Sequence, residues 1–313
     1  MEARALGTYG PVLSVVGVGC NNFGMRIDAE ASAAVVRAAL DAGVTHFDTA
    51  EMYGGGQSEA FLGRALGANR DRAVIATKFT PRPTDEPYTA GALARRIRDA
   101  CEASLRRLGT DRIDLYYQHY PDPDAPIGEA LETLEDLVRE GKVLHVASSN
   151  PSAELVAAHH TVARERGLTA YCGIQVEWSL LARGVEAHIV PAAAARAIGI
   201  VPYFPLASGL LTGKYRRDEP FPDGSRLASS PYFAAVATED NFAMVERLTA
   251  FAGDHGHDLI DLAVGWLLSQ PGVSSVIAGA TTPAQVQANA AAAGWRLDAD
   301  KLAEIDSLLG DDR

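Results

Sequence analysis

The chain of 313 residues has few cysteines, no excess of positive charge and no long apolar run. Its three cysteines, Cys20, Cys101 and Cys172, lie far apart and form no C-x-x-C pair, so buried free thiols are expected instead of a zinc or redox site. The net charge of −12 would repel nucleic acid and anionic lipid, so neither is expected as a partner.

Neither a signal peptide nor a transmembrane helix is predicted. The segment 1–5 does not begin an apolar core of signal-peptide length, and no stretch of about 18 uncharged apolar residues occurs. With 47% hydrophobic and 22% charged residues, the composition is that of a globular protein able to bury a large core. We therefore expect a cytoplasmic protein that does not bind membranes.

Short β-branched or apolar runs alternate with longer alanine-rich segments from about Val15 onward. This alternation is typical of repeated strand-helix units. The expected strands number eight, as an α/β barrel requires, and they span 15–19, 45–48, 73–78, 113–118, 143–148, 171–175, 200–204 and 274–277. Helical periodicity between them predicts helices at 31–41, 90–108, 127–140, 153–166, 189–197, 259–269 and 283–292.

Local start signals agree with this pattern, because Ser152 and Thr282 precede expected helices as good N-cap residues. A long polar insertion at 212–240 is expected on the active face, followed by extra helices at 236–255 and 300–309. No linker divides the chain. The predicted fold is therefore α/β: a (β/α)8 TIM barrel with an N-terminal strand or hairpin segment and extra C-terminal helices, forming one domain over 1–313.

Polar residues end or follow the second, third and fourth expected strands. They are Asp48, Tyr53, Lys78 and His119. In such barrels the carboxyl ends of the strands form the active face. A phenol with a pKa near ~10 is a weak acid at neutral pH, and a neighbouring ammonium group favours its phenolate.

These four residues therefore predict a proton-delivery site, in which Asp48 keeps Lys78 charged, Lys78 acidifies Tyr53, and His119 positions a carbonyl oxygen. Each residue alone has a simpler interpretation. Asp48 could be a helix cap and Tyr53 a loop aromatic, while Lys78 could be a solvated strand end and His119 a core histidine. Their occurrence together at matching strand ends favours the catalytic interpretation.

The sequence resembles the aldo-keto reductase family from Gly17 to about Trp295. The motifs that carry the resemblance are DTAEMYG at 48–54, GKV at 141–143, SSN at 148–150, QVEWSLL at 175–181, PLASGLLTGKY at 205–215 and GATT at 279–282. The resemblance implies that Tyr53 is the general acid of a reversible carbonyl reduction by NAD(P)H, with Asp48, Lys78 and His119 completing the site.

The resemblance also implies the cofactor site. Ser149, Asn150 and Gln175 match residues that bind the nicotinamide amide, and Trp178 matches one that stacks on the nicotinamide ring. A packing residue at the barrel top is the alternative for Trp178. The remaining matches surround the phosphates and adenosine: Phe204, Pro205, Leu206, Ser208, Gly209, Leu211, Gly279, Thr281, Thr282, Gln285 and Asn289. No G-x-G-x-x-G fingerprint follows a strand, so a Rossmann domain is not predicted.

The nucleotide implied is NADP(H) in preference to NAD(H), although the residues near Thr281 and Gln285 are neutral where relatives often carry a cation. A cation of the long loop could take the place of that missing charge, and the candidates are Lys214, Arg216, Arg217 and Arg226. The alternative for each is a side chain that only faces solvent. The expected substrate is a small aldehyde, ketone or sugar-like carbonyl, contacted by Asn22, Phe23, Tyr88 and Tyr120.

The sequence agrees less well with two other functions. A cofactor-sensing regulatory subunit with little turnover would be favoured by an altered tetrad, and the tetrad is intact. A hydrolase or lyase barrel would need a metal-ligand cluster or a glutamate pair, and neither is predicted; no metal site is expected. The sequence predicts no particular oligomeric state.

Overall fold

The computed structural model describes residues 1–81 and 87–310. Eight parallel strands form one sheet in the order β10-β3-β4-β5-β6-β7-β8-β9. Contacts between β9 and the segment before β10, including a bridge between Ile200 and Val273, bring the sheet close to closure. The strands are β3 (Val16–Gly19), β4 (His46–Asp48), β5 (Val74–Phe79), β6 (Ile113–Gln118), β7 (Val143–Ser149), β8 (Gly173–Glu177), β9 (Gly199–Tyr203) and β10 (Val276–Gly279). The predicted (β/α)8 barrel is confirmed.

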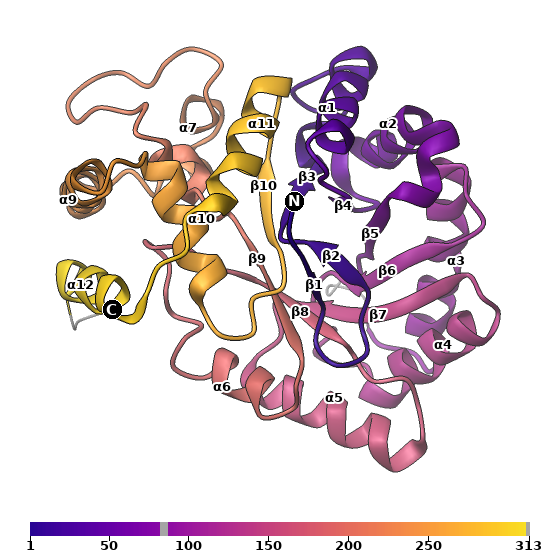
Figure 1. The fold of residues 1–313 in the computed structure, drawn as a ribbon. Helices are drawn as coiled ribbons and strands as arrows, with labels where there is room; N and C mark the ends of the chain where they lie inside the picture. The colour runs from indigo at the N-terminus through magenta and orange to yellow at the C-terminus, as the bar shows by residue number, and fades with distance from the viewer. Residues whose placement is uncertain (82–86, 311–313) are drawn as a thin grey trace.

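Helices surround the barrel on its outer face (Figure 1). They are α1 (Ala29–Asp41), α2 (Gln57–Leu66), α3 (Ala92–Leu108), α4 (Ile127–Arg139), α5 (Ala153–Arg166), α6 (Ile189–Ala194), α10 (Leu259–Ser269) and α11 (Pro283–Ala291). The predicted caps form, since the side chains of Ser152 and Thr282 accept from the backbone N–H groups of Leu155 and Gln285. Helix α2 was not predicted from the sequence.

A buried carboxylate of helix α2 accepts a hydrogen bond from strand β5. Glu59 is fully buried in the first turn of α2, and it accepts hydrogen bonds from Thr77 of β5 at 2.6 Å and from Arg107 of α3 at 2.6 Å. A buried carboxylate is stable only with such partners. Since Lys78 follows Thr77 directly, this contact fixes the strand segment that carries the lysine.

An antiparallel hairpin closes the amino-terminal end of the barrel, as Figure 1 shows in front of the strands. It consists of β1 (Ala3–Ala5) and β2 (Val12–Ser14). Leu6 and Leu13 of the hairpin are completely buried and pack with barrel residues such as Leu115 and Val201. The hairpin therefore supplies the apolar floor of the barrel, and the open end lies at the carboxyl ends of the strands.

Glycines in β8 and β9 make room for this floor. A Cβ atom at Gly199 would lie 2.5 Å from the backbone nitrogen of Gly7 and 2.6 Å from Leu6 Cδ1. We expect Gly199→Ala to lower the free energy of unfolding by about 1–3 kcal/mol, because backbone must shift to admit the methyl group. Urea denaturation measures this effect.

The matched control for that variant is Gly253→Ala. Gly253 lies in helix α9, and no atom comes within 4 Å of a Cβ built there. The alanine should stabilise the protein by roughly 0.5–1 kcal/mol through its higher helix propensity. Equal stability of both variants would show that the hairpin does not pack against β9 as described.

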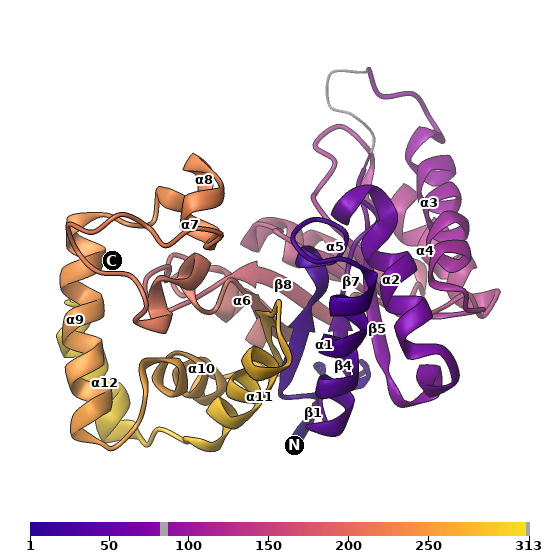
Figure 2. The same ribbon diagram turned by 90° about the horizontal axis from the view of Figure 1, so that it is seen from above.

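The carboxyl-terminal part adds four helices to the barrel. They are α7 (Arg226–Ser229), α8 (Pro231–Ala234), α9 (Glu239–Asp254) and α12 (Ala299–Leu309), in agreement with the predicted insertion and extra helices. Helices α9 and α12 pack together on the side of the barrel away from α3 and α4 (Figure 1 and Figure 2). Over the described ranges, no helix combines the length and apolarity needed to cross a membrane.

Candidate active site

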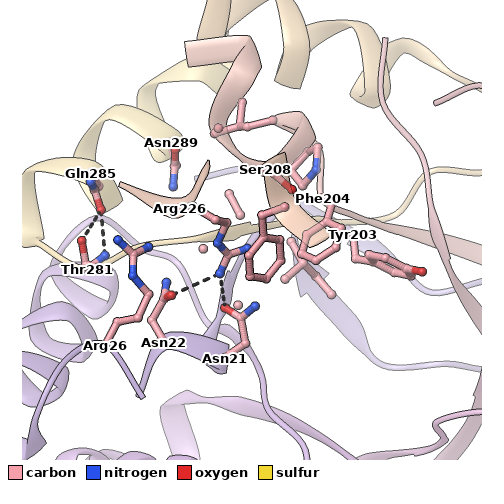
Figure 3. A pocket seen from close by; sticks show the side chains of 18 of the residues that line it. Asn21, Asn22, Arg26, Tyr203, Phe204, Ser208, Arg226, Thr281, Gln285 and Asn289 are labelled. Atoms are coloured by element: carbon pink, nitrogen blue, oxygen red, sulfur yellow. Dashed lines mark hydrogen bonds between the residues drawn. The ribbon is translucent and has the colours of Figure 1, made fainter. Parts of the chain in front are cut away.

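A cavity of about 700 Å³ opens at the carboxyl ends of the strands. It extends from Asp48, Tyr53 and His119 to Gln285 and Asn289 of α11, and Figure 3 shows side chains around it. One hollow therefore joins the predicted catalytic residues to the predicted adenosine end. Its length along the barrel rim arises because β4, β6, β9 and β10 all end at the same face.

Lys78 lies beneath this cavity with no exposed surface. Its Nζ donates to Asp48 Oδ1 at 2.5 Å and to the carbonyl oxygen of Thr49 at 2.7 Å. The second oxygen of Asp48 accepts from Gln175 Nε2 at 2.8 Å. Burial disfavours the ammonium form and is the largest single influence, but the charges and hydrogen bonds of Asp48 and Tyr53 together outweigh it and raise the pKa of Lys78, so the lysine is charged at neutral pH.

Tyr53 begins a short 3-10 turn, Tyr53–Gly56, directly above Lys78. The Nζ of Lys78 lies 5.1 Å from the centre of the phenol ring. Burial raises the pKa of Tyr53 above its ordinary value, and the charge and hydrogen bond of Lys78 oppose that shift. The predicted pairing of ammonium and phenol is therefore present, with desolvation as the larger influence on the phenol.

The turn that presents Tyr53 depends on glycine. Gly54, Gly55 and Gly56 have φ values of 58°, 62° and 90°. Glycine adopts this left-handed region without steric cost. A Cβ at Gly54 would also lie 2.9 Å from the carbonyl oxygen of Phe23, so the sequence Tyr-Gly-Gly-Gly allows the turn to approach the neighbouring loop.

His119 is buried beside Tyr53, with ring centres 5.9 Å apart and an edge-to-face orientation. The imidazole also stacks on the ring of Tyr120, with ring centres 4.6 Å apart. Burial lowers the pKa of His119 to about 3, and the charge of Lys78 adds to this shift, so the imidazole is neutral at physiological pH. Its Nδ1 atom is buried and has no hydrogen-bond partner among the described residues.

A polar network follows β7 at the wall of the cavity. Asn150 has a φ of 56°, and its side-chain nitrogen donates to the carbonyl oxygen of His119 at 3.2 Å. The Asn150 side-chain oxygen accepts from the hydroxyl of Tyr203 at 2.8 Å. Ser149, Asn150 and Gln175 therefore line the cavity as the resemblance implies.

Trp178 does not line the cavity, contrary to expectation. Its ring is almost completely buried and packs edge to face against Trp266 of α10, and Nε1 donates to Glu186 at 2.9 Å. Its alternative interpretation, as a packing residue, agrees with this placement. The aromatic side chain that lines the cavity here is Tyr203, the last residue of β9.

Unusual backbone shapes the loop after β9. Phe204, Ala207 and Ser208 all have positive φ, between 45° and 56°, and Gly209 reaches 98°. Most of the residues predicted to wrap the phosphates line the cavity: Phe204, Pro205, Leu206, Ser208 and Gly209. Leu211 does not, because it is completely buried in the core beneath this loop.

The adenosine end predicted from the sequence forms around the start of α11. Gly279, Thr281, Gln285 and Asn289 line the cavity. Gln285 Oε1 accepts from the backbone nitrogen of Thr281 at 2.7 Å and from its hydroxyl at 3.0 Å, as dashed lines show in Figure 3. Thr282 caps the helix, and its side chain does not line the cavity in the described structure.

Three cations line the cavity among the described residues. Lys214 and Arg226 were predicted to do so, and Arg26, from the loop after β3, was not. Arg217 instead forms ion pairs with Glu239 and Glu246 of α9, and Arg216 does not line the cavity.

The predicted substrate residues divide into two groups. Asn22 and Tyr120 line the cavity, together with the unpredicted Met52 and the aromatic Tyr232 and Phe233. Phe23 and Tyr88 do not line the cavity. Phe23 is completely buried in the core, and the hydroxyl of Tyr88 donates to Glu129 of α4.

The site geometry agrees with comparisons with known proteins. The model of the "Aldo/keto reductase family" matches residues 15–310. The chain belongs to the aldo/keto reductase family. It is similar to the "Probable aldo-keto reductase 1" of Glycine max, with 34% identity over 96% of this chain and 86% of that protein. It is also similar to the "Aldo-keto reductase YhdN" of Bacillus subtilis (strain 168), with 33% identity over 99% of this chain and 94% of that protein.

Membership of this family makes the chain an oxidoreductase. The family also suggests a small-molecule carbonyl substrate. Within the described ranges, no group of three or more His, Cys, Asp or Glu residues is arranged to hold a metal ion. All three cysteines are buried and free.

Proposed function

We propose that this aldo-keto reductase reduces aldehydes or ketones to alcohols, reversibly, with NADPH as hydride donor. One observation supports it above the others: a buried, charged Lys78 lies between Asp48 and the phenol of Tyr53 at the base of a large cavity. This places an ionisable hydroxyl next to a fixed positive charge, which is the requirement for a phenol that gives and takes a proton.

The residues of the cavity fit a dinucleotide. The cavity has room for a cofactor-sized molecule, and three cations line it without a carboxylate partner in the described structure. Ser149, Asn150 and Gln175 would hold the nicotinamide amide, with Tyr203 as the aromatic surface beside the ring. The loop 204–209 would supply backbone N–H groups to phosphate oxygens, because left-handed backbone forms concave anion sites. When bound, the nicotinamide supplies the hydride.

The tetrad then handles the proton. His119 is neutral, so its ring can hydrogen-bond the carbonyl oxygen without competing as an acid. Tyr53 donates its hydroxyl proton to that oxygen as negative charge develops there. Lys78, kept charged by Asp48, stabilises the phenolate left behind. Oxidation of an alcohol uses the same groups in reverse, with the phenolate as base.

We also propose NADP(H) as the preferred nucleotide. Three cationic side chains line the cavity, although the net charge of the protein is −12. An additional phosphate would benefit from these charges. A cofactor-sensing subunit with little turnover is not favoured, because Asp48, Tyr53, Lys78 and His119 are all present and lie next to one another.

A binding and turnover assay tests the proposal. The purified protein is titrated with NADPH and NADH, with binding followed by nicotinamide fluorescence, and is then incubated with a panel of aliphatic, aromatic and sugar aldehydes and ketones. We expect tighter binding of NADPH and carbonyl-dependent oxidation of it. Binding without oxidation of NADPH by any carbonyl would favour the sensor, and absence of binding would reject both functions.

A further inference from the structure

Positive charge exceeds negative charge in the cavity lining, because three cations face one carboxylate outside the tetrad, Asp223. Arg26, Lys214 and Arg226 line the cavity, and no ion pair joins any of them to a carboxylate among the described residues. Lys214 instead lies 5.0 Å from the ring centre of Tyr215. The net positive charge that this leaves in one hollow of an acidic protein indicates an anionic ligand with more than one charged group.

Arg226 holds a central position in this hollow. Its Nη2 donates to two neutral amide oxygens, of Asn21 at 3.2 Å and Asn22 at 3.1 Å. Its guanidinium also lies 4.9 Å from the ring centre of Phe233 and 5.6 Å from that of Phe204. These contacts fix the guanidinium in place beside the loop after β9 without neutralising its charge.

Arg26 lies near Arg226 but faces a different part of the cavity. Burial lowers the pKa of Arg226, and the charge of Arg26 lowers it further, so the two guanidinium groups repel each other. Arg26 is exposed, and its one hydrogen bond in the described structure goes to the backbone oxygen of Gly224. Figure 3 shows its guanidinium turned toward Thr281 and Gln285.

The end of the cavity at Thr281 is otherwise neutral. Thr281, Gln285 and Asn289 provide hydroxyl and amide groups there, and the N-terminus of α11 adds backbone N–H groups. These groups can hydrogen-bond a phosphate but do not neutralise it. Arg26 lines the same cavity and turns its guanidinium toward Thr281 and Gln285 at this end (Figure 3).

We infer that Arg26 is the residue that selects NADPH over NADH, by pairing with the phosphate on the adenosine ribose, while Arg226 contacts the phosphates common to both. This inference rests on the proposed function, since it assumes a nicotinamide dinucleotide in the cavity. It assigns the selective charge to the loop between β3 and α1, which meets the segment before α11 where Asn22 donates to the carbonyl oxygen of Ala280. The two nucleotides differ in this one phosphate, so a single cation that contacts it changes their relative affinity.

Calorimetric titration with NADP⁺ and NAD⁺ tests Arg26 without relying on catalysis. We expect Arg26→Ala to weaken NADP⁺ binding roughly 10- to 100-fold, the range for losing one charge-assisted hydrogen-bonded pair, and to leave NAD⁺ binding nearly unchanged. Arg26→Lys should recover part of the affinity, because the charge remains but the paired N–H geometry is lost. Arg226→Ala should weaken both nucleotides.

The matched control is Arg247→Ala, which removes an exposed arginine of α9 outside the cavity and changes the net charge equally. It should bind both nucleotides as the unmodified protein does. Equal losses for NADP⁺ and NAD⁺ in Arg26→Ala, or no loss for either, would overturn the inference while leaving the proposed function in place. If the unmodified protein bound neither nucleotide, the proposed function itself would fail. Thermal unfolding of each variant confirms that an affinity change does not reflect unfolding.

Discussion

Tyr53→Phe is expected to slow carbonyl reduction by roughly 10²- to 10⁴-fold, the usual contribution of a positioned general acid. The variant loses one hydroxyl, and the phenyl ring keeps its edge-to-face contact with His119. Nucleotide affinity should stay nearly the same, because the cations, the loop 204–209 and the residues of β7 remain. Single-turnover kinetics with preformed enzyme and NADPH measure the rate, and fluorescence titration measures the affinity.

The control for this variant is Tyr232→Phe. Tyr232 lines the same cavity but is 71% exposed, and its hydroxyl is not next to Lys78. Its rate should stay close to that of the unmodified protein. If Tyr53→Phe reduced carbonyls as fast as Tyr232→Phe does, Tyr53 could not be the proton donor.

Asp48→Asn should destabilise the protein by about 3–5 kcal/mol, because it leaves the ammonium of Lys78 buried without a counter-ion. The side chain of Lys78 has no exposed surface, so water cannot replace the lost carboxylate. The same change lowers activity, since Lys78 no longer holds its charge beside Tyr53. Urea denaturation gives the free energy of unfolding, and steady-state kinetics give the activity.

The double variant Asp48→Asn, Lys78→Met separates the two effects. Removing both charges removes the uncompensated ion, so most of the lost stability should return. Activity should stay low, because no ammonium group remains beside Tyr53. A double variant that is as unstable as Asp48→Asn would mean that the lost stability does not come from the unpaired lysine; a double variant with full activity would mean that Lys78 has no part in catalysis.

The sequence predicted most of the barrel because apolar runs and helical periodicity are local properties. Strand β6 and helices α5 and α10 begin and end at the predicted residues. The tetrad was also predictable, since parallel strands bring their carboxyl ends to one rim, and Asp48 and Lys78 stand at or next to such ends. Helix α2 was missed because its ten residues follow the glycine turn directly and contain polar groups that are buried, Ser58 and Glu59.

The direction of individual side chains was less predictable. Trp178 and Tyr203 both stand at the ends of neighbouring strands, yet one ring turns into the core against Trp266 and the other lines the cavity. That choice depends on the packing of α10, which is distant in sequence. Arg26 was missed for a related reason, because the loop after β3 meets the segment before α11 only in space, where Asn22 donates to the carbonyl oxygen of Ala280.

The most direct test of the proposed reaction is the destination of the hydride. The enzyme is incubated with an aromatic aldehyde and NADPH that carries deuterium at the transferable position of the nicotinamide, and the alcohol is analysed by mass spectrometry. We predict deuterium on the carbinol carbon with the unmodified protein and very little alcohol with Tyr53→Phe. An alcohol without deuterium, or equal amounts of labelled alcohol from both proteins, would contradict hydride transfer assisted by Tyr53.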